Sequence, residues 1–202
     1  PRTIRIRPGK EQEVKTRIEK YGFTLEKTYI PNVFALGRTE DFDPLERRIG
    51  YTVDHLVGNF YIQELAAATS VHILSEGKIH EDEFVILDMA ASPGGKTTQL
   101  SEQYPNAFII ANEPTRERIP QLLQNLDRMG STNIGVTLYP GQYFTKTPET
   151  FDRILLDAPC SGEGTLYKGT DATKHWHIKN IKTISRLQEK LINAAIIALK
   201  VG

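Results

Sequence analysis

The sequence predicts an α/β fold, in which an open parallel sheet wound with helices follows a small α+β unit. From residue 84 onward, short apolar runs alternate with amphipathic helical stretches, the pattern of a parallel sheet with helical crossovers. A glycine turn at residues 90–95 stands between the first run and a helix, as in the ligand-binding corners of such sheets. Residues 1–50 lack this alternation and form a separate unit.

Composition is that of an ordinary globular protein. The chain has 202 residues, 39% of them apolar and 25% charged, and its formal net charge is zero. Zero net charge argues against a strongly basic nucleic-acid coat protein but leaves room for a local basic patch. No run approaches the ~18 apolar residues of a membrane span, and the opening PRTIRIRP has no signal-peptide core. A cytoplasmic protein without membrane association is therefore expected.

The chain has one cysteine, Cys160. It excludes an internal disulfide and any multi-cysteine zinc site. His55, His72 and His80 show no metal-ligand spacing, so no metal site is expected. Taken without its neighbours, a lone cysteine is most simply a small buried hydrophobe.

Residues 1–50 predict a small β-α-β-β domain. Alternation of isoleucine and arginine at residues 4–7 indicates a half-buried strand. Apolar side chains at helical spacing in residues 14–21 indicate a helix, and the runs 23–29 and 32–36 indicate two further strands.

The opening of this domain is locally basic. A solvated face is the simpler explanation, and a phosphate-contacting module is the alternative. The basic side chains are those of Arg2, Arg5, Arg7, Lys10, Lys15 and Arg17.

Residues 51–202 predict the second domain, which begins with an amphipathic helix. Its apolar face is formed by Ile62, Leu65, Ala66, Thr69 and Ile73. Strands are expected at 84–88, 107–111, 134–138 and 151–156. The first three are far enough apart for a helix between each pair, which predicts parallel strands with right-handed crossovers. The third and fourth are closer, so we expect a short or irregular connection.

Two helices of this domain have clear signals. The stripe of Leu122, Leu123, Leu126 and Met129 predicts one, with Pro120 in its first turn and Gly130 as its stop. A long apolar face over residues 181–199 predicts the other. Because such a helix should lead into a fifth strand, we expect the sheet to lack its C-terminal strands.

The residues of the glycine turn argue against a nucleotide phosphate loop. Gly95-Lys96-Thr97 suggests a phosphate loop, but Ala90 stands where the first glycine is required. Glu113 ends the second strand, where a carboxylate can bind both hydroxyls of a ribose. A nucleoside-type cofactor is therefore expected, although a surface charge is the simpler explanation of Glu113 taken alone.

The stretch DAPCSG offers chemistry beside this turn. Asp157 ends the fourth strand, and Pro159 stiffens a turn that would hold Cys160 over the cofactor crevice. Methylation at C5 of a pyrimidine needs a thiolate at C6, because the ring carbon is otherwise a poor nucleophile. A carboxylic acid near N3 assists that addition. Cys160 and Asp157 are the right groups for such a site.

With these motifs, the chain from Asn59 onward resembles the Nol/Nop/Sun family of S-adenosylmethionine-dependent RNA (cytosine-5) methyltransferases. LDMAASPGGKTTQL is similar to the family's cofactor loop, and ANEPTRERIPQLLQNLDRMG to its second motif. DAPCSGEGT is similar to its fourth motif and is the most specific of the three. The first domain is similar to that of the bacterial ribosomal-RNA branch.

The resemblance implies a Rossmann-like class I methyltransferase sheet that binds S-adenosylmethionine. Glu113 would bind the ribose, and Asp157 would face the cofactor or the target cytosine. The implied substrate is RNA, ribosomal RNA first and tRNA second, and a monomer is favoured. The residues implied to line the cofactor are Ala90, Ala91, Ser92, Pro93, Gly94, Gly95 and Lys96.

Two features depart from the family pattern. Pro140 stands where the third motif usually has an acidic residue, which removes a side-chain hydrogen bond to the adenine. The family's attacking cysteine lies in a later Thr-Cys or Ser-Cys motif that this sequence does not contain, and Cys160 would then assist product release. Two alternatives stay open: a methyltransferase with Cys160 as nucleophile, and a catalytically incomplete RNA-binding protein.

Overall fold

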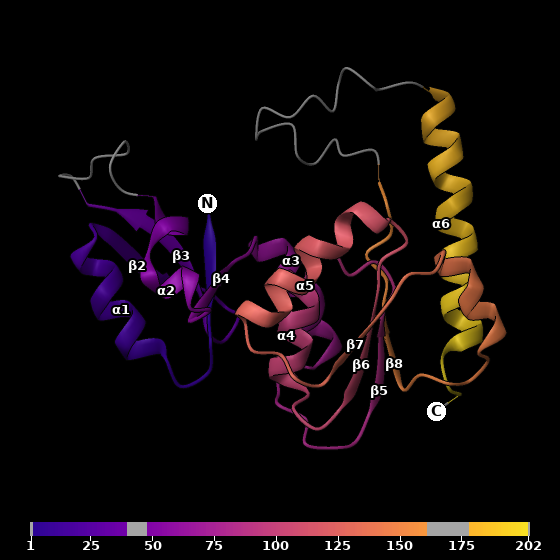
Figure 1. The fold of residues 1–202 in the computed structure, drawn as a ribbon, viewed down its shortest axis with the longest axis horizontal. Coiled ribbons are helices and arrows are strands. Elements are labelled where there is room, and N and C mark those ends of the chain that lie inside the picture. The colour runs from indigo at the N-terminus through magenta and orange to yellow at the C-terminus, as the bar shows by residue number, and fades with distance from the viewer. Residues whose placement is uncertain (1, 40–47, 161–177, 202) are drawn as a thin grey trace.

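The computed structural model describes residues 2–39, 48–160 and 178–201. Two sheets stand side by side within this part of the chain (Figure 1). The first is antiparallel and the second parallel.

The first sheet contains β1 (Thr3–Ile6), β2 (Phe23–Lys27), β3 (Val33–Arg38) and β4 (Phe60–Ile62) in the order β2-β3-β1-β4. Helix α1 (Glu11–Lys20) covers one face, because its Val14 and Ile18 are buried against the sheet. The fourth strand comes from beyond residue 50, so the first sheet extends past the boundary expected there.

Short helical segments lead from β3 to β4 and onward. They are η1 (Ile49–Tyr51) and α2 (Val53–Leu56) before β4, and α3 (Leu65–Leu74) after it.

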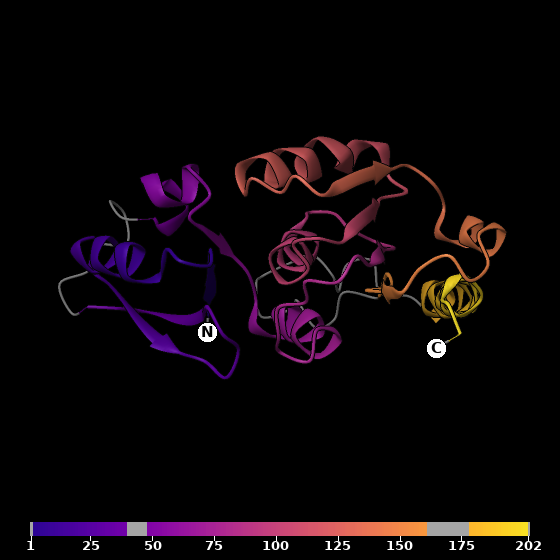
Figure 2. The ribbon, with the colours of Figure 1, turned by 90° about the horizontal axis from the view of Figure 1, so that it is seen from below.

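The second sheet confirms the predicted parallel fold. Its strands run in the order β7-β6-β5-β8, and every neighbouring pair is parallel. Figure 2 shows α3, α4 and α5 on one side of the sheet and α6 on the other. The short connection expected between the third and fourth strands is the 3₁₀ helix η3. The elements from β5 on are β5 (Val85–Asp88), α4 (Gly95–Gln103), β6 (Phe108–Asn112), η2 (Arg116–Arg118), α5 (Ile119–Arg128), β7 (Ile134–Thr137), η3 (Gly141–Lys146), β8 (Arg153–Leu155) and α6 (Ile178–Ala198).

The predicted apolar face of the helix before β5 is wrong. Ile62 belongs to β4, where it pairs with Ile4, and the helix begins only at Leu65. The extended backbone at Glu64 separates strand from helix, so a single helical spacing cannot span both. The helix buries Ala68 and Val71, whereas Ile73 is 70% exposed.

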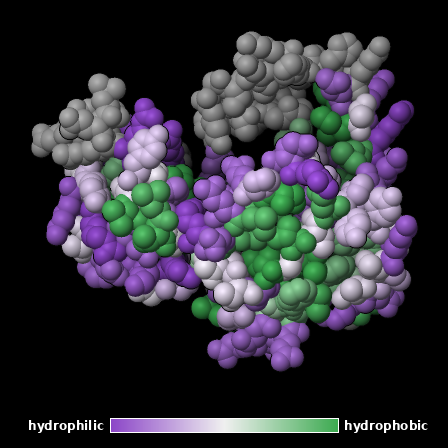
Figure 3. Space-filling view, in the orientation of Figure 1, coloured by the Kyte–Doolittle hydropathy of each residue, from purple (hydrophilic) through white to green (hydrophobic). Residues whose placement is uncertain are grey.

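Helix α5 has the predicted bounds, with Pro120 in its first turn and Gly130 after its end at a φ of +64°. Leu122, Leu126 and Met129 are buried, whereas Leu123 of the predicted stripe is 48% exposed. Figure 3 shows a hydrophobic surface beside this helix, where it borders β7.

A buried arginine joins the first sheet to α4. Arg5 was expected on the polar side of a half-buried strand, but it is only 2% exposed. Its guanidinium donates to the carbonyl oxygen of Gly95 and to Oγ1 of Thr98, both at 2.7 Å. It also pairs with Glu102, the nearest N–O distance being 2.8 Å, and donates to Gln63. Strand β1 is thus buried on both faces.

Arg17, another residue of the basic opening, is also engaged within the protein. It pairs with Asp54 and Glu13. The hydrogen bonds from Arg17 hold the pKa of Asp54 below its ordinary value. A solvated basic face therefore does not account for Arg5 or Arg17.

A second link runs from α5 back to the first sheet. Arg128 donates to the carbonyl oxygens of His55 at 2.8 Å and Phe60 at 3.2 Å, and its guanidinium lies 5.3 Å from the Tyr61 ring centre. Gly58 has a φ of +74°, and a Cβ there would lie 1.7 Å from the Arg128 carbonyl oxygen. Only glycine allows so close an approach.

Candidate functional site

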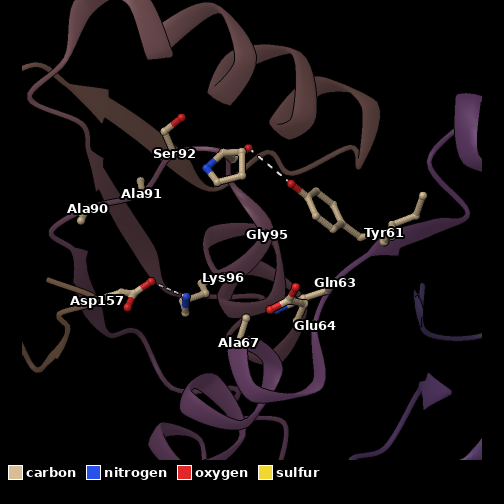
Figure 4. A pocket seen from close by; sticks show the side chains of 12 residues that line it. Tyr61, Gln63, Glu64, Ala67, Ala90, Ala91, Ser92, Gly95, Lys96 and Asp157 are labelled. Carbon is tan, nitrogen blue, oxygen red and sulfur yellow. Dashed lines mark hydrogen bonds and ion pairs between the residues drawn. The ribbon is translucent and has the colours of Figure 1, made fainter. Parts of the chain in front are cut away.

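A cavity of about 180 Å³ opens at the carboxyl end of β5 (Figure 4). The glycine turn forms one wall and the segment after β4 forms another. It is lined by Tyr61, Ile62, Gln63, Glu64, Ala67, Ala90, Ala91, Ser92, Pro93, Gly95, Lys96 and Asp157. The fold therefore brings Asp157 together with most of the predicted turn residues. Gly94, Glu113 and Cys160 do not line this cavity.

The turn has glycine at two successive positions, and the backbone requires it at the first. Gly94 has a φ of +104°, and a Cβ on it would lie 3.2 Å from the side chain of Leu122. A Cβ on Gly95 would lie 3.1 Å from the Tyr61 ring. Helix α4 begins at Gly95, and the first N–H groups of a helix have no partner within it. The turn can therefore present a positive helix end to an anionic group.

Helix α5 and the segment before it hold the turn from the other side. Arg118 donates to the carbonyl oxygen of Ser92 at 2.7 Å, and the Ser92 hydroxyl donates back to the Arg118 carbonyl oxygen at 3.2 Å. Asn125 donates to the carbonyl oxygen of Pro93 at 2.8 Å. These hydrogen bonds hold the turn mainly by its backbone carbonyl groups, and Ser92 is the one turn residue that contributes a side chain to them.

Asp88 lies directly beneath the turn. It is fully buried, and its Oδ2 accepts a hydrogen bond from the Thr97 hydroxyl at 2.7 Å. Burial raises the pKa of Asp88 to about 6, because a charged carboxylate is costly away from water. The Thr97 hydrogen bond opposes that rise. Asp88 therefore ties the end of β5 to the first turn of α4.

Glu113 follows the last residue of β6 and is 1% exposed. Its Oε1 accepts a hydrogen bond from the Thr115 N–H at 2.9 Å. Its Oε2 accepts none, although Arg118 lies 3.4 Å away as an ion-pair partner. A buried carboxylate oxygen without a donor is costly, so this oxygen suits a ligand with hydroxyl donors such as a ribose.

Asn112 is a buried residue that sequence reasoning missed. Its amide nitrogen donates to the carbonyl oxygens of Met89 and Tyr139, and its side-chain oxygen accepts from the Thr137 hydroxyl and the Tyr139 N–H. It thereby joins the ends of three strands around the site. The one available signal was a polar side chain closing the apolar run before Glu113.

Asp157 faces the cavity from the end of β8. Lys96 donates to its Oδ2 at 2.5 Å, as Figure 4 shows across the cavity. The Asp157 side chain is 59% exposed, so a ligand can reach it. Cys160, three residues later, is also exposed, and Gln188 of α6 holds the carbonyl oxygen of Pro159 at 2.8 Å. The rest of the DAPCSGEGT motif lies outside the described residues.

Among the described residues, no three His, Cys, Asp or Glu side chains gather in a way that could hold a metal ion. Within the same part of the chain, none of the helices is both long enough and apolar enough to cross a membrane.

Residues 76–202 match the family of proteins described as 16S rRNA methyltransferase RsmB/F. The chain belongs to this family. The resemblance found in the motifs, to the bacterial ribosomal-RNA branch of the Nol/Nop/Sun methyltransferases, is thereby confirmed.

RsmB/F relatives share much of the chain's sequence. It is 42% identical over 173 residues to ribosomal RNA small subunit methyltransferase F of Vibrio cholerae, covering 85% of this chain and 35% of the relative. The same protein of Aeromonas hydrophila is 40% identical over 189 residues, covering 92% and 39%. The chain thus spans well under half the length of these relatives.

Solved structures share the fold. A methyltransferase homologue from Pyrococcus horikoshii superposes with a TM-score of 0.81 at 29% identity, covering 100% of this chain and 62% of that one. NSun6 from the same organism, solved with SFG, superposes with a TM-score of 0.82 at 19% identity, covering 98% and 72%. The predicted Rossmann-like sheet of class I methyltransferases is confirmed.

Replacing Asp88 tests the cost of its burial. Its pKa is about 6 in the folded chain and close to 3.8 when unfolded. Between these values the folded chain binds more protons, so the free energy of unfolding falls as the pH rises. From pH 4 to pH 7, we expect wild type to lose about 2 kcal/mol relative to Asp88→Asn, measured by urea unfolding.

The control for this measurement is Asp82→Asn, because Asp82 is exposed. The difference between that variant and wild type should stay constant with pH. A constant difference for Asp88→Asn as well would contradict the raised pKa.

Proposed function

We propose that this chain is the cofactor-binding part of an RNA (cytosine-5) methyltransferase. It would transfer a methyl group from S-adenosylmethionine to C5 of a cytosine, giving 5-methylcytosine. The single observation that carries this proposal is the buried Glu113, whose Oε2 has no hydrogen-bond donor. It stands at the end of β6, beside the glycine turn after β5. Ribosomal RNA is the favoured substrate, ahead of tRNA, because the RsmB/F relatives are named for it.

The residues present fit this cofactor. The two hydroxyls of its ribose would donate to Glu113, as in other wound sheets. Residues 90–96 would lie along the amino-acid part, whose carboxylate suits the start of α4. Gly94 and Gly95 let the turn pack closely against Leu122 and the Tyr61 ring, which sets the position of the turn beside the ligand. When bound, the cofactor supplies a sulfonium methyl group.

Asp157 and Lys96 are proposed to serve the target base. Both line the cavity, and their ion pair orients the Asp157 carboxyl. Asp157 would face N3 of the cytosine while a thiolate adds to C6. The target must lie in a loop or be flipped out of a helix to enter this cavity.

In the proposed reaction, the thiolate–C6 bond would leave C5 electron-rich. C5 would then be able to take the methyl group that the cofactor supplies, with S-adenosylhomocysteine as the other product. Loss of the C5 proton then expels the thiolate from C6 and restores the ring. We assign Cys160 to this last step, since its turn is exposed and follows Asp157 directly.

We further propose that the protein acts in the cytoplasm and as a monomer. Its proposed substrate is made in the cytoplasm of the bacteria in which the RsmB/F relatives occur.

Cofactor binding tests the proposal directly. In a calorimetric titration with S-adenosylmethionine, we expect saturable binding by the wild-type chain. Glu113→Gln should weaken it about tenfold or more, because a hydrogen bond to a charged group is lost. Glu117→Gln is the matched control, since Glu117 is exposed four residues away. No binding at millimolar cofactor, or equal affinities for the two variants, would contradict the proposal.

Trapping on modified RNA tests the role of Cys160. A fluorine at C5 prevents the final elimination, so an attacking thiolate stays bound to C6. With 5-fluorocytidine RNA and S-adenosylmethionine, we expect no covalent adduct through Cys160. An adduct on a denaturing gel that Cys160→Ser abolishes would make Cys160 the nucleophile and reject its assignment to product release.

A further inference from the structure

A groove of about 630 Å³ lies at one end of the first sheet. At this end β1 and β2 begin and β3 and β4 finish, because β3 runs antiparallel to both β1 and β2 and β4 runs antiparallel to β1. Its main lining residues are Arg2, Arg38, Arg48, Tyr51, Leu36 and Ile62.

The described residues that line the groove carry positive charge. They have three guanidinium groups, and none of them has a carboxylate. In a chain with zero net charge, this concentration of arginine is a local feature. Arg2 is the member of the basic opening that lies here, whereas Arg5 and Arg17 are engaged within the protein. Arg2, Arg38 and Arg48 therefore form a basic surface that the sequence of residues 1–20 alone did not indicate.

An exposed aromatic ring stands in the groove. Tyr51 is 74% exposed, and the Arg48 guanidinium lies over its ring, 5.8 Å from the ring centre. Arginines together with a ring on which a base can stack are the features of sites for single-stranded nucleic acids. The apolar floor of Leu36 and Ile62 suits the faces of bases better than a free inorganic ion.

The groove and the candidate site share a lining residue. Ile62, at the end of β4, lines both the groove and the cavity beside the glycine turn. The next two residues, Gln63 and Glu64, line that cavity as well. A strand of RNA lying in the groove would therefore lead directly to the place where the target base is expected.

We propose that this groove binds the single-stranded RNA that flanks the target cytosine. Arg2, Arg38 and Arg48 contact its phosphates, and Tyr51 stacks on one of its bases. This inference rests on the proposed function and adds to it the surface that recognises the substrate. A protein partner with an acidic segment is the competing occupant.

The test measures RNA affinity by fluorescence anisotropy, with a labelled 12-nucleotide single-stranded RNA of mixed sequence. Arg48→Glu and Tyr51→Ala should each weaken binding about tenfold. Arg48→Glu should also lower the salt dependence of log K by about one. Lys27→Glu makes the same charge change at the far, exposed end of β2 and should change affinity less than about twofold.

Three outcomes would overturn the proposal that the groove binds RNA. The first is that the wild-type chain binds S-adenosylmethionine but does not bind this RNA. Equal RNA affinities for Arg48→Glu and Lys27→Glu are the second. Binding of polyglutamate as tight as that of RNA, lost in Arg48→Glu, is the third and would make the groove a protein-docking surface.

A cofactor titration on the same samples separates the two proposals. If the wild-type chain does not bind S-adenosylmethionine, the result counts against the proposed function. Intact cofactor binding with unchanged RNA affinity in Arg48→Glu counts against the groove alone. Urea unfolding of each variant shows that a lost affinity does not come from a lost fold.

Discussion

A buried arginine holds the two sheets together, and the candidate site depends on it. Arg5 leaves the first sheet and meets the Gly95 carbonyl, Thr98 and Glu102 of α4. Because a buried guanidinium without partners is costly, the first sheet fits only where α4 presents these acceptors. The same contacts fix the start of α4 and therefore the glycine turn. The first sheet is thus a structural part of the site, and its own groove opens beside the cavity.

Three carboxylates stand at the ends of neighbouring parallel strands, and their surroundings give them different roles. Asp88 is fully buried, has a raised pKa and ties β5 to α4. Glu113 is buried with one oxygen lacking a donor, which suits ribose hydroxyls. Asp157 is exposed and paired with Lys96, which suits a substrate that enters and leaves. Parallel topology brings them to one edge, while burial and partners distinguish them.

Local sequence patterns predicted the parallel sheet, α5 and the positions of Glu113 and Asp157. Each of these depends on residues that are neighbours in the sequence: apolar runs mark the strand ends, and Pro120 and Gly130 mark the ends of α5. The burial of Arg5 was not predicted, because an arginine that alternates with isoleucines in a strand is usually exposed to solvent. Its acceptor Gly95 lies 90 positions later. Asn112 likewise joins strands that meet only in the fold. Strand β4 is only three residues long and lies just before α3. Its Ile62 fits the helical spacing of the residues that follow, so the strand was predicted as part of the helix.

The most direct test of this account is the free energy of unfolding of Arg5→Met, measured in urea beside Lys27→Met at an exposed position. Removing Arg5 leaves Glu102, Gln63 and the Gly95 carbonyl without their donor. The account predicts a loss of about 3 kcal/mol or more for Arg5→Met and less than about 0.5 kcal/mol for Lys27→Met. Equal stabilities of the two variants would show that the sheets and the glycine turn do not depend on Arg5.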